Sequence, residues 1–182
     1  AHGSFLRAIP GTVIEDFANK ALIVNGHSVQ MIAANDPGAI DYTSYGINNA
    51  LIIDNTGVSR DREGLSKHLN SKGASKVLLT APGKGDVPNV VYGVNEESFD
   101  HQSETIFSAA SCTTNAIVPV LAVIEKALGI EKGHIETIHS YTNDQNLLDN
   151  YHKKYRRGRS AALNMVITET GADKAVAKVL PP

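Results

Sequence analysis

ALIID at residues 50–54 and KVLLT at residues 76–80 are the two short apolar runs that decide the fold. Continuous apolar runs of this length are typical of strands that are covered on both faces. Between them, residues 61–69 have the pattern of a short charged helix, with Leu65 and Leu69 on one side. This alternation of strand, helix and strand predicts a parallel α/β sheet, in which ligands bind beyond the carboxyl ends of the strands.

The chain before these runs predicts a β-hairpin. Two apolar segments, residues 21–24 and 29–32, flank the pair Asn25-Gly26. Both residues of an Asn-Gly pair tolerate positive φ, which a tight hairpin turn requires.

Composition indicates an ordinary globular protein. The 182 residues are 42% apolar and 20% charged, and the 17 basic and 19 acidic residues leave a net charge of −2. Neither a nucleic acid nor an anionic membrane is favoured by this charge. One cysteine cannot form an internal disulfide, and neither a membrane-spanning apolar run nor a signal peptide is visible. We therefore expect a reduced, cytoplasmic compartment and no membrane partner.

Cys112 is a candidate nucleophile because it lies in SCTTN (residues 111–115), directly before an apolar helical pattern over residues 116–128. Helix N-terminal N–H groups stabilise a thiolate, the reactive form of cysteine. The alternative is a buried structural cysteine. We expect the helix to begin near Asn115 or to bend early, because Pro119 is tolerated only in a first turn or at a kink, and to end at Gly129.

The rest of the second half is less decisive. Residues 135–142 alternate and predict a strand, and residues 143–159 form a long polar stretch that contains a basic cluster. This stretch is either a functional loop or a solvated surface. Seven histidines are present, and their positions alone select none of them as a catalytic base. Thr170-Gly171, before a helix at residues 172–180, is either an anion site or an ordinary N-cap.

Polar residues follow both predicted strands, at residues 55–57 and 80–82, where they are either binding or simple loop residues. The sequence contains neither GxGxxG nor a Walker A motif. A dinucleotide site therefore cannot be derived from a phosphate-binding fingerprint.

Several motifs together give the chain a family resemblance. They are SCTTN at 111–115, His139, RRGR at 156–159 and TGADKAV at 170–176, preceded by HG at 2–3, TG at 56–57, KVLLTAP at 76–82 and YGVN at 92–95. In this order they resemble phosphorylating glyceraldehyde-3-phosphate dehydrogenase, and they cover essentially the whole chain.

The resemblance implies an α/β fold: part of a Rossmann-type parallel-sheet domain with a β-hairpin over residues 1–110, followed by the start of an α+β catalytic domain over 111–182. It implies oxidation of D-glyceraldehyde 3-phosphate with inorganic phosphate to 1,3-bisphosphoglycerate through a cysteine thioester, a reaction of glycolysis and gluconeogenesis. The cofactor would be NAD, with NADP as the alternative, because the acidic position that discriminates them is missing from the chain. No metal site is implied.

Site residues follow from the same motifs. Cys112 matches the nucleophile and His139 the partner that keeps the thiol ionised and moves the proton. The remaining matches are Ser111, Thr113, Thr170 and Gly171 for the attacking phosphate, with Arg157 nearby, Thr142 for the phosphate of the substrate, Thr80 for the nicotinamide end of the cofactor and Asn35 for the neighbourhood of the adenine.

Departures from the family pattern limit these expectations. Ala116 stands where many members have a second cysteine, and both the glycine-rich cofactor turn and the rest of the catalytic domain are missing. We therefore expect a central fragment that alone binds NAD poorly and turns over little. The resemblance implies a homotetramer in which residues 143–159 reach the cofactor of a neighbouring subunit.

Two other functions remain open. Residues 144–145 and 149–152 are also similar to the erythrose-4-phosphate dehydrogenases of the same superfamily, although Thr142 and the Thr170-Gly171 site favour the triose phosphate. The second alternative is a noncatalytic module that binds RNA through residues 153–159. Scarcity of aromatic residues argues against nucleic acid, because only Tyr151 and Tyr155 are interleaved with the basic cluster.

Overall fold

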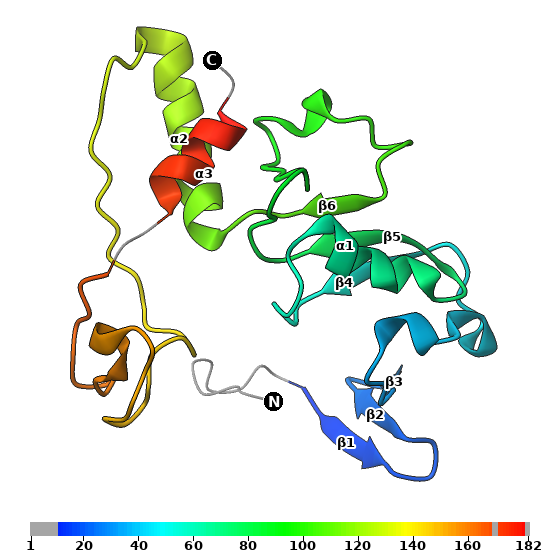
Figure 1. Cartoon of the computed structure of the whole chain (residues 1–182). Helices are drawn as coiled ribbons and strands as arrows, with labels where there is room; N and C mark the ends of the chain where they lie inside the picture. Colours follow the sequence, from blue (N-terminus) through cyan, green and yellow to red (C-terminus); the bar gives the residue numbers. More distant parts are fainter. Residues whose placement is uncertain (1–10, 169–170, 181–182) are drawn as a thin grey trace.

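The computed structural model of the chain describes residues 11–168 and 171–180, and the side chains of residues 172–174 are left out (Figure 1). The motif at residues 2–3 and the predicted phosphate-site residue Thr170 lie outside the described residues. None of the helices in the described ranges has the length and apolar content needed to cross a membrane.

A three-stranded parallel sheet forms the centre of the first part; the sequence predicts a parallel sheet and its first two strands, but not the third. Its strands are β4 (Ala50–Asp54), β5 (Ala74–Leu79) and β6 (Ile106–Ser108), in the order β4-β5-β6. The chain passes from β4 to β5 through α1 (Arg62–Ser66) and the 3-10 helix η3 (Lys67–Asn70), which match the predicted helix.

The sheet and α1 share one hydrophobic core. Leu65, Val77 and Leu79 are fully buried in it, and Leu69 packs against it, so the predicted inner side of the helix is confirmed. The expectation that both faces of the strands are covered is wrong for β4. Leu51 and Ile53 remain 52% and 55% exposed, because no part of the described chain covers that face.

An antiparallel three-stranded sheet precedes the parallel one. It consists of β1 (Val13–Asp16), β2 (Ala21–Val24) and β3 (His27–Gln30), and the sequence did not predict β1. Asn25 and Gly26 connect β2 to β3 with φ values of 51° and 84°. Two successive positive φ values give the turn a twist that matches the twist of the paired strands.

Helix α2 (Cys112–Leu128) runs directly on from β6, and α3 (Ala172–Val179) packs against it (Figure 1). α2 begins earlier than expected, because the Ser111 side chain caps it by accepting a hydrogen bond from the Thr114 N–H at 2.9 Å. It also continues through Pro119, which therefore lies in its third turn and not in its first. The helix tolerates a residue that cannot donate to the Asn115 carbonyl, and it ends at Gly129, with φ 73°.

The expectation of a strand at residues 135–142 is wrong. The segment is extended but unpaired, and Ile138 is 96% exposed. A strand needs a neighbour for its backbone N–H and C=O groups, and the described residues provide none here. Four short 3-10 helices complete the element list: η1 (Pro37–Ala39), η2 (Tyr42–Tyr45), η4 (Glu96–Ser98) and η5 (Tyr155–Gly158).

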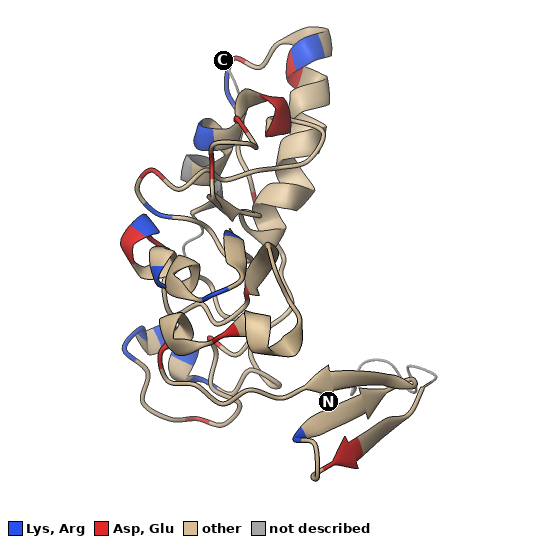
Figure 2. Ribbon diagram, turned by 90° about the vertical axis from the view of Figure 1, so that its right-hand side faces the viewer, with Lys and Arg blue, Asp and Glu red and all other residues tan. Residues whose placement is uncertain are grey.

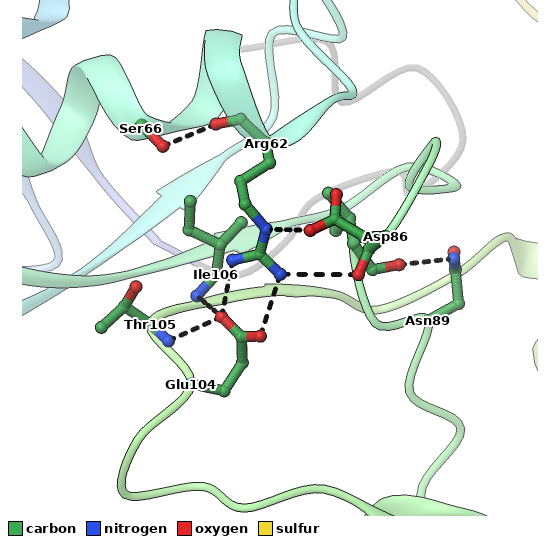
Figure 3. A network of polar contacts seen from close by, with 8 residues as sticks. Arg62, Ser66, Asp86, Asn89, Glu104, Thr105 and Ile106 are labelled. Carbon is green, nitrogen blue, oxygen red and sulfur yellow. Dashed lines mark hydrogen bonds and ion pairs between the residues drawn. The ribbon is translucent and has the colours of Figure 1, made fainter.

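An ion-pair network fastens α1 to the long connection between β5 and β6 (Figure 3). Arg62 donates to both carboxylate oxygens of Glu104 at 2.9 Å and to Asp86 at 2.5 Å. Glu104 also accepts from the N–H groups of Thr105 and Ile106. In contrast, α2 is uncharged along most of its length (Figure 2), because Glu125 and Lys126 near its end are its only charged residues.

Candidate active site

A short turn places Cys112 beyond the carboxyl end of the parallel sheet. β6 ends at Ser108 and α2 begins at Cys112, so only three residues separate the strand from the helix. Ala110 lies in this turn with φ 57°, a left-handed conformation that is uncommon for alanine. The amide of Asn115 donates to the carbonyls of Ala109 and Ser111 at 2.8 and 2.9 Å and thereby ties the turn together. Cys112 is exposed at the end of the helix, not a buried structural residue.

The imidazole of His139 contacts the thiol. Its Nε2 lies 3.3 Å from Cys112 Sγ, and its Nδ1 lies 2.6 Å from the Ser140 carbonyl oxygen. A carbonyl can only accept, so Nδ1 carries a proton and Nε2 is the nitrogen that exchanges a proton with the thiol. This is the nucleophile–base geometry that covalent catalysis requires.

Both pKa values move in the direction that ionises this pair. The hydrogen bond with His139 lowers the pKa of Cys112, aided by the Thr113 hydroxyl and N–H, although desolvation opposes the shift. The same contact with Cys112, followed by the bond to the Ser140 carbonyl, raises the pKa of His139. Both shifts act toward a thiolate beside an imidazolium.

Of the predicted phosphate residues, Ser111, Thr113 and Gly171 lie near the Cys112 turn. Ser111 Oγ lies 2.6 Å from the Thr114 hydroxyl, so the Ser111 side chain serves mainly as a helix cap. Gly171, at the N-terminus of α3, lines a cavity of about 150 Å³ together with Ala110 and Thr114.

Arg157 and Thr142 are not joined to this group. Arg157 forms an ion pair with Asp144 and donates to the Thr168 hydroxyl at 3.0 Å. Thr142 is exposed and bonds through its carbonyl to the Gln145 N–H. Within residues 11–168 and 171–180, no hydrogen bond connects either residue to Cys112 or His139.

The two predicted cofactor residues lie at opposite ends of β5. Thr80 follows its carboxyl end, is exposed, and donates to the Asn55 amide oxygen at 2.8 Å. Asn35 is exposed just before η1, whose Pro37 carbonyl accepts from the Ser71 hydroxyl near the amino end of β5. Six strand residues separate these ends, which corresponds to roughly 20 Å.

Acidic residues partly neutralise the basic cluster. Arg157 pairs with Asp144, and Arg159 lies 3.3 Å from Asp149, whereas Tyr151 and Tyr155 are 84% and 91% exposed. Over the same described ranges, no group of three His, Cys, Asp or Glu residues is placed to hold a metal ion.

Three contributors to the site did not emerge from the sequence patterns. Ser140 orients the imidazole through a backbone carbonyl, Asn115 fastens the turn, and Asn55 bonds Thr80. Asn115 and Asn55 belong to segments that were singled out, but their partners are distant in sequence or are backbone atoms. The sequence could have indicated a role for the two asparagines only through their positions: Asn55 directly follows a predicted strand, and Asn115 lies at the start of a predicted helix.

The sequence is similar to known dehydrogenases. Residues 111–182 match the family model of the glyceraldehyde 3-phosphate dehydrogenase C-terminal domain. A glyceraldehyde-3-phosphate dehydrogenase-like protein of Pseudomonas aeruginosa is 57% identical over 99% of this chain and 38% of its own length. A chloroplastic glyceraldehyde-3-phosphate dehydrogenase of Arabidopsis thaliana is 49% identical over 88% of this chain and 40% of its own length.

A third relative, glyceraldehyde-3-phosphate dehydrogenase 2 of a Nostoc species, is 45% identical over 90% of this chain and 48% of its own length. The chain thus spans less than half the length of these curated relatives. Over nearly its whole length the chain is similar to glyceraldehyde-3-phosphate dehydrogenases.

Proposed function

We propose that the protein containing this chain oxidises D-glyceraldehyde 3-phosphate with NAD or NADP and inorganic phosphate to 1,3-bisphosphoglycerate. The contact between Cys112 Sγ and His139 Nε2 at 3.3 Å carries this proposal. It supplies an ionisable nucleophile beside a base, at the edge of the sheet where ligands of α/β proteins bind.

Four steps describe the chemistry at Cys112. The thiolate attacks the aldehyde carbon, and the new C–S bond gives a hemithioacetal whose oxygen takes a proton from the His139 imidazolium. As the carbon loses a hydride, His139 takes this proton back and a thioester forms. An oxygen of inorganic phosphate then attacks the thioester carbon. The C–S bond breaks, the acyl phosphate leaves, and the thiolate is regenerated.

The described residues fit only one end of a dinucleotide cofactor. Thr80 and Asn55 are exposed polar groups beyond the sheet edge, beside the strand that leads to Cys112. They suit the carboxamide of a nicotinamide ring. The glycine-rich turn that would hold a pyrophosphate is not among the 182 residues. When bound, the cofactor would accept the hydride; Thr80 would orient its ring, and Asn35 would lie toward the adenine.

Two phosphate-binding regions are part of the proposal, on the basis of the family resemblance. Ser111, Thr113, Thr170 and Gly171 would receive the attacking phosphate, whereas Thr142 would receive the phosphate of the substrate. Arg157 would serve the first region only after it exchanges Asp144 for the phosphate, because its guanidinium is already paired.

The organisation of the protein is part of the proposal. Residues 1–110 would belong to a Rossmann-type cofactor domain and residues 111–182 to the catalytic domain, which is the range that the family model covers. We also propose a cytoplasmic homotetramer. Exposed apolar side chains in the segment at residues 143–159, such as Leu148 at 78% and Tyr155 at 91%, support a surface that a neighbouring subunit covers.

The proposed substrate is tested by the rates of NAD or NADP reduction with two aldehydes, each measured with and without inorganic phosphate. The full-length protein should reduce NAD or NADP faster with glyceraldehyde 3-phosphate than with erythrose 4-phosphate, and omission of phosphate should slow it at least about tenfold, because the thioester then reacts only with water. Faster turnover of erythrose 4-phosphate without phosphate dependence would establish the alternative dehydrogenase instead. RNA binding with an unreactive Cys112 would establish the noncatalytic module.

A further inference from the structure

The hydroxyl of Ser108 lies at the junction between the parallel sheet and the turn that carries Cys112. Ser108 ends β6 and is fully buried. Its Oγ accepts from the N–H groups of Ala110 at 2.9 Å and Gly83 at 3.1 Å, and donates to the Ala81 carbonyl at 2.7 Å. A hydroxyl has one proton and two acceptor lone pairs, so the two N–H groups occupy the lone pairs, and the one proton is shared between the Ala81 carbonyl and the amide oxygen of Asn89.

The loop after β5 is built around this hydroxyl. Asn89 Oδ1 lies 3.0 Å from Ser108 Oγ and accepts from the Gly83 N–H at 2.9 Å, and the Asn89 amide donates back to the Gly83 carbonyl. A Cβ on Gly83 would lie 2.7 Å from Val87 Cγ1 and 3.1 Å from Ser108 Cβ, so only glycine allows this close approach. The loop that follows Thr80 is therefore fastened to Ser108.

The turn before Cys112 depends on the same atom. Ala110 holds a φ of 57° and is 4% exposed. Left-handed backbone is unfavourable for alanine and persists only where surrounding contacts impose it. Without the Ser108 hydroxyl, the buried Ala110 N–H would lose its acceptor. Relaxation of the turn would then lower its free energy, and it would change the direction in which the chain enters Ser111 and Cys112.

We propose that Ser108 is a positioning residue for Cys112: its hydroxyl holds the Ala110 turn and thereby aims the thiol at His139. This inference rests on the proposed role of Cys112 as nucleophile, but it concerns the reactivity of the thiol before any substrate binds. Removal of the hydroxyl loosens the contact with His139 and leaves Cys112 closer to an ordinary thiol.

The test compares Ser108→Ala with Ser75→Ala in the full-length protein. Ser75 is a matched control, because its hydroxyl also donates to a backbone carbonyl, that of Ala50, but near the amino end of β5. The rate of alkylation by iodoacetamide is measured from pH 5 to 10 on the peptide that contains Cys112, by mass spectrometry, alongside the unfolding temperature. Following this peptide excludes signals from any other cysteine.

We expect Ser108→Ala to move the midpoint of the alkylation profile to higher pH and to slow the reaction at pH 7 by about three- to tenfold, with Ser75→Ala unchanged. A lower unfolding temperature with an unshifted profile would show a merely structural Ser108 and overturn the proposal. If Ser108→Ala does not fold, Asn89→Ala is tested in its place. We expect the midpoint of its alkylation profile to move to higher pH by a smaller amount, and an unshifted midpoint would overturn the proposal. An ordinary thiol profile in the wild type would overturn the proposed function and this inference together.

Discussion

His139 is held at both of its ring nitrogens. Nδ1 is fixed by the Ser140 carbonyl, and Nε2 lies 3.3 Å from the Cys112 sulfur. The Ser140 carbonyl fixes the proton on Nδ1, so Nε2 is the nitrogen that exchanges a proton with the thiol. The contact between Nε2 and the sulfur therefore controls how readily the thiol ionises. The reactivity of this cysteine should therefore depend on one side chain more than on the helix that begins there.

Replacement His139→Asn tests this dependence. The asparagine amide cannot carry a positive charge, so the pKa of Cys112 should rise toward the ordinary thiol value of about 8.5. The thiolate fraction then falls wherever the pH lies below that value. We expect alkylation of Cys112 at pH 7 to slow by about tenfold, with the rates of the two proteins converging above about pH 9. The measurement is the pH profile of iodoacetamide alkylation.

His134→Asn provides the control, because His134 is another exposed histidine on the same extended segment. Its profile should equal that of the wild type. Equal profiles for His139→Asn and wild type would show that the contact does not control the thiol.

At the scale of elements, the ion pair between Arg62 and Glu104 fastens α1 to the start of β6. The hydrogen bonds from Arg62 hold the pKa of Glu104 at about 2, against an ordinary value of 4.5. The folded pKa is lowered, so the stabilisation is present above about pH 4.5 and is lost as the pH falls toward 2. Acid should therefore weaken this connection between α1 and β6.

Replacement Glu104→Gln should lower the free energy of unfolding at pH 7 by about 1–2 kcal/mol, a range reduced for the partial exposure of Arg62. It should also flatten the pH dependence of stability between pH 5 and 2. Urea unfolding at pH 7 and at pH 3 measures both effects. Asp86→Asn is the matched control with a smaller expected loss, because the Asp86 side chain is 70% exposed. If Glu104→Gln lost as much stability between pH 7 and pH 3 as the wild type does, this account would be contradicted.

Elements could be predicted where their signal is local. The apolar runs of β4 and β5 and the helical spacing of α2 up to Gly129 are contiguous patterns. β6 was missed because it has only three residues, too few for a pattern. The strand expected at residues 135–142 was wrong because pairing depends on a neighbour that local alternation does not reveal. His139 was one of seven histidines, and the family resemblance, not its spacing, selected it as the partner of Cys112.

At the scale of the whole molecule, the described residues hold the proposed nucleophile and its proposed base but only part of the proposed cofactor site. The glycine-rich turn is not in the sequence, and Asn35 and Thr80 lie at opposite ends of β5. Residues 1–182 expressed alone should therefore bind NAD at least about tenfold more weakly than the full-length protein, because the pyrophosphate contacts are lost. Isothermal titration calorimetry of both proteins with NAD measures the difference.

Alkylation of Cys112 provides the control for folding in this comparison. A shortened chain that keeps the reactive thiol but not the cofactor affinity would fit the proposal. Equal affinity in the two proteins would show that residues 1–182 contain a complete cofactor site.

The uncovered face of β4 affects how this chain behaves on its own. β4 is an edge strand, and Leu51 and Ile53 are more than half exposed on it. An apolar edge strand is a template to which a strand of another molecule can add, which starts aggregation. Preparations of residues 1–182 should therefore be kept dilute, and a lysine at position 51 or 53 is the smallest change that would discourage such strand addition.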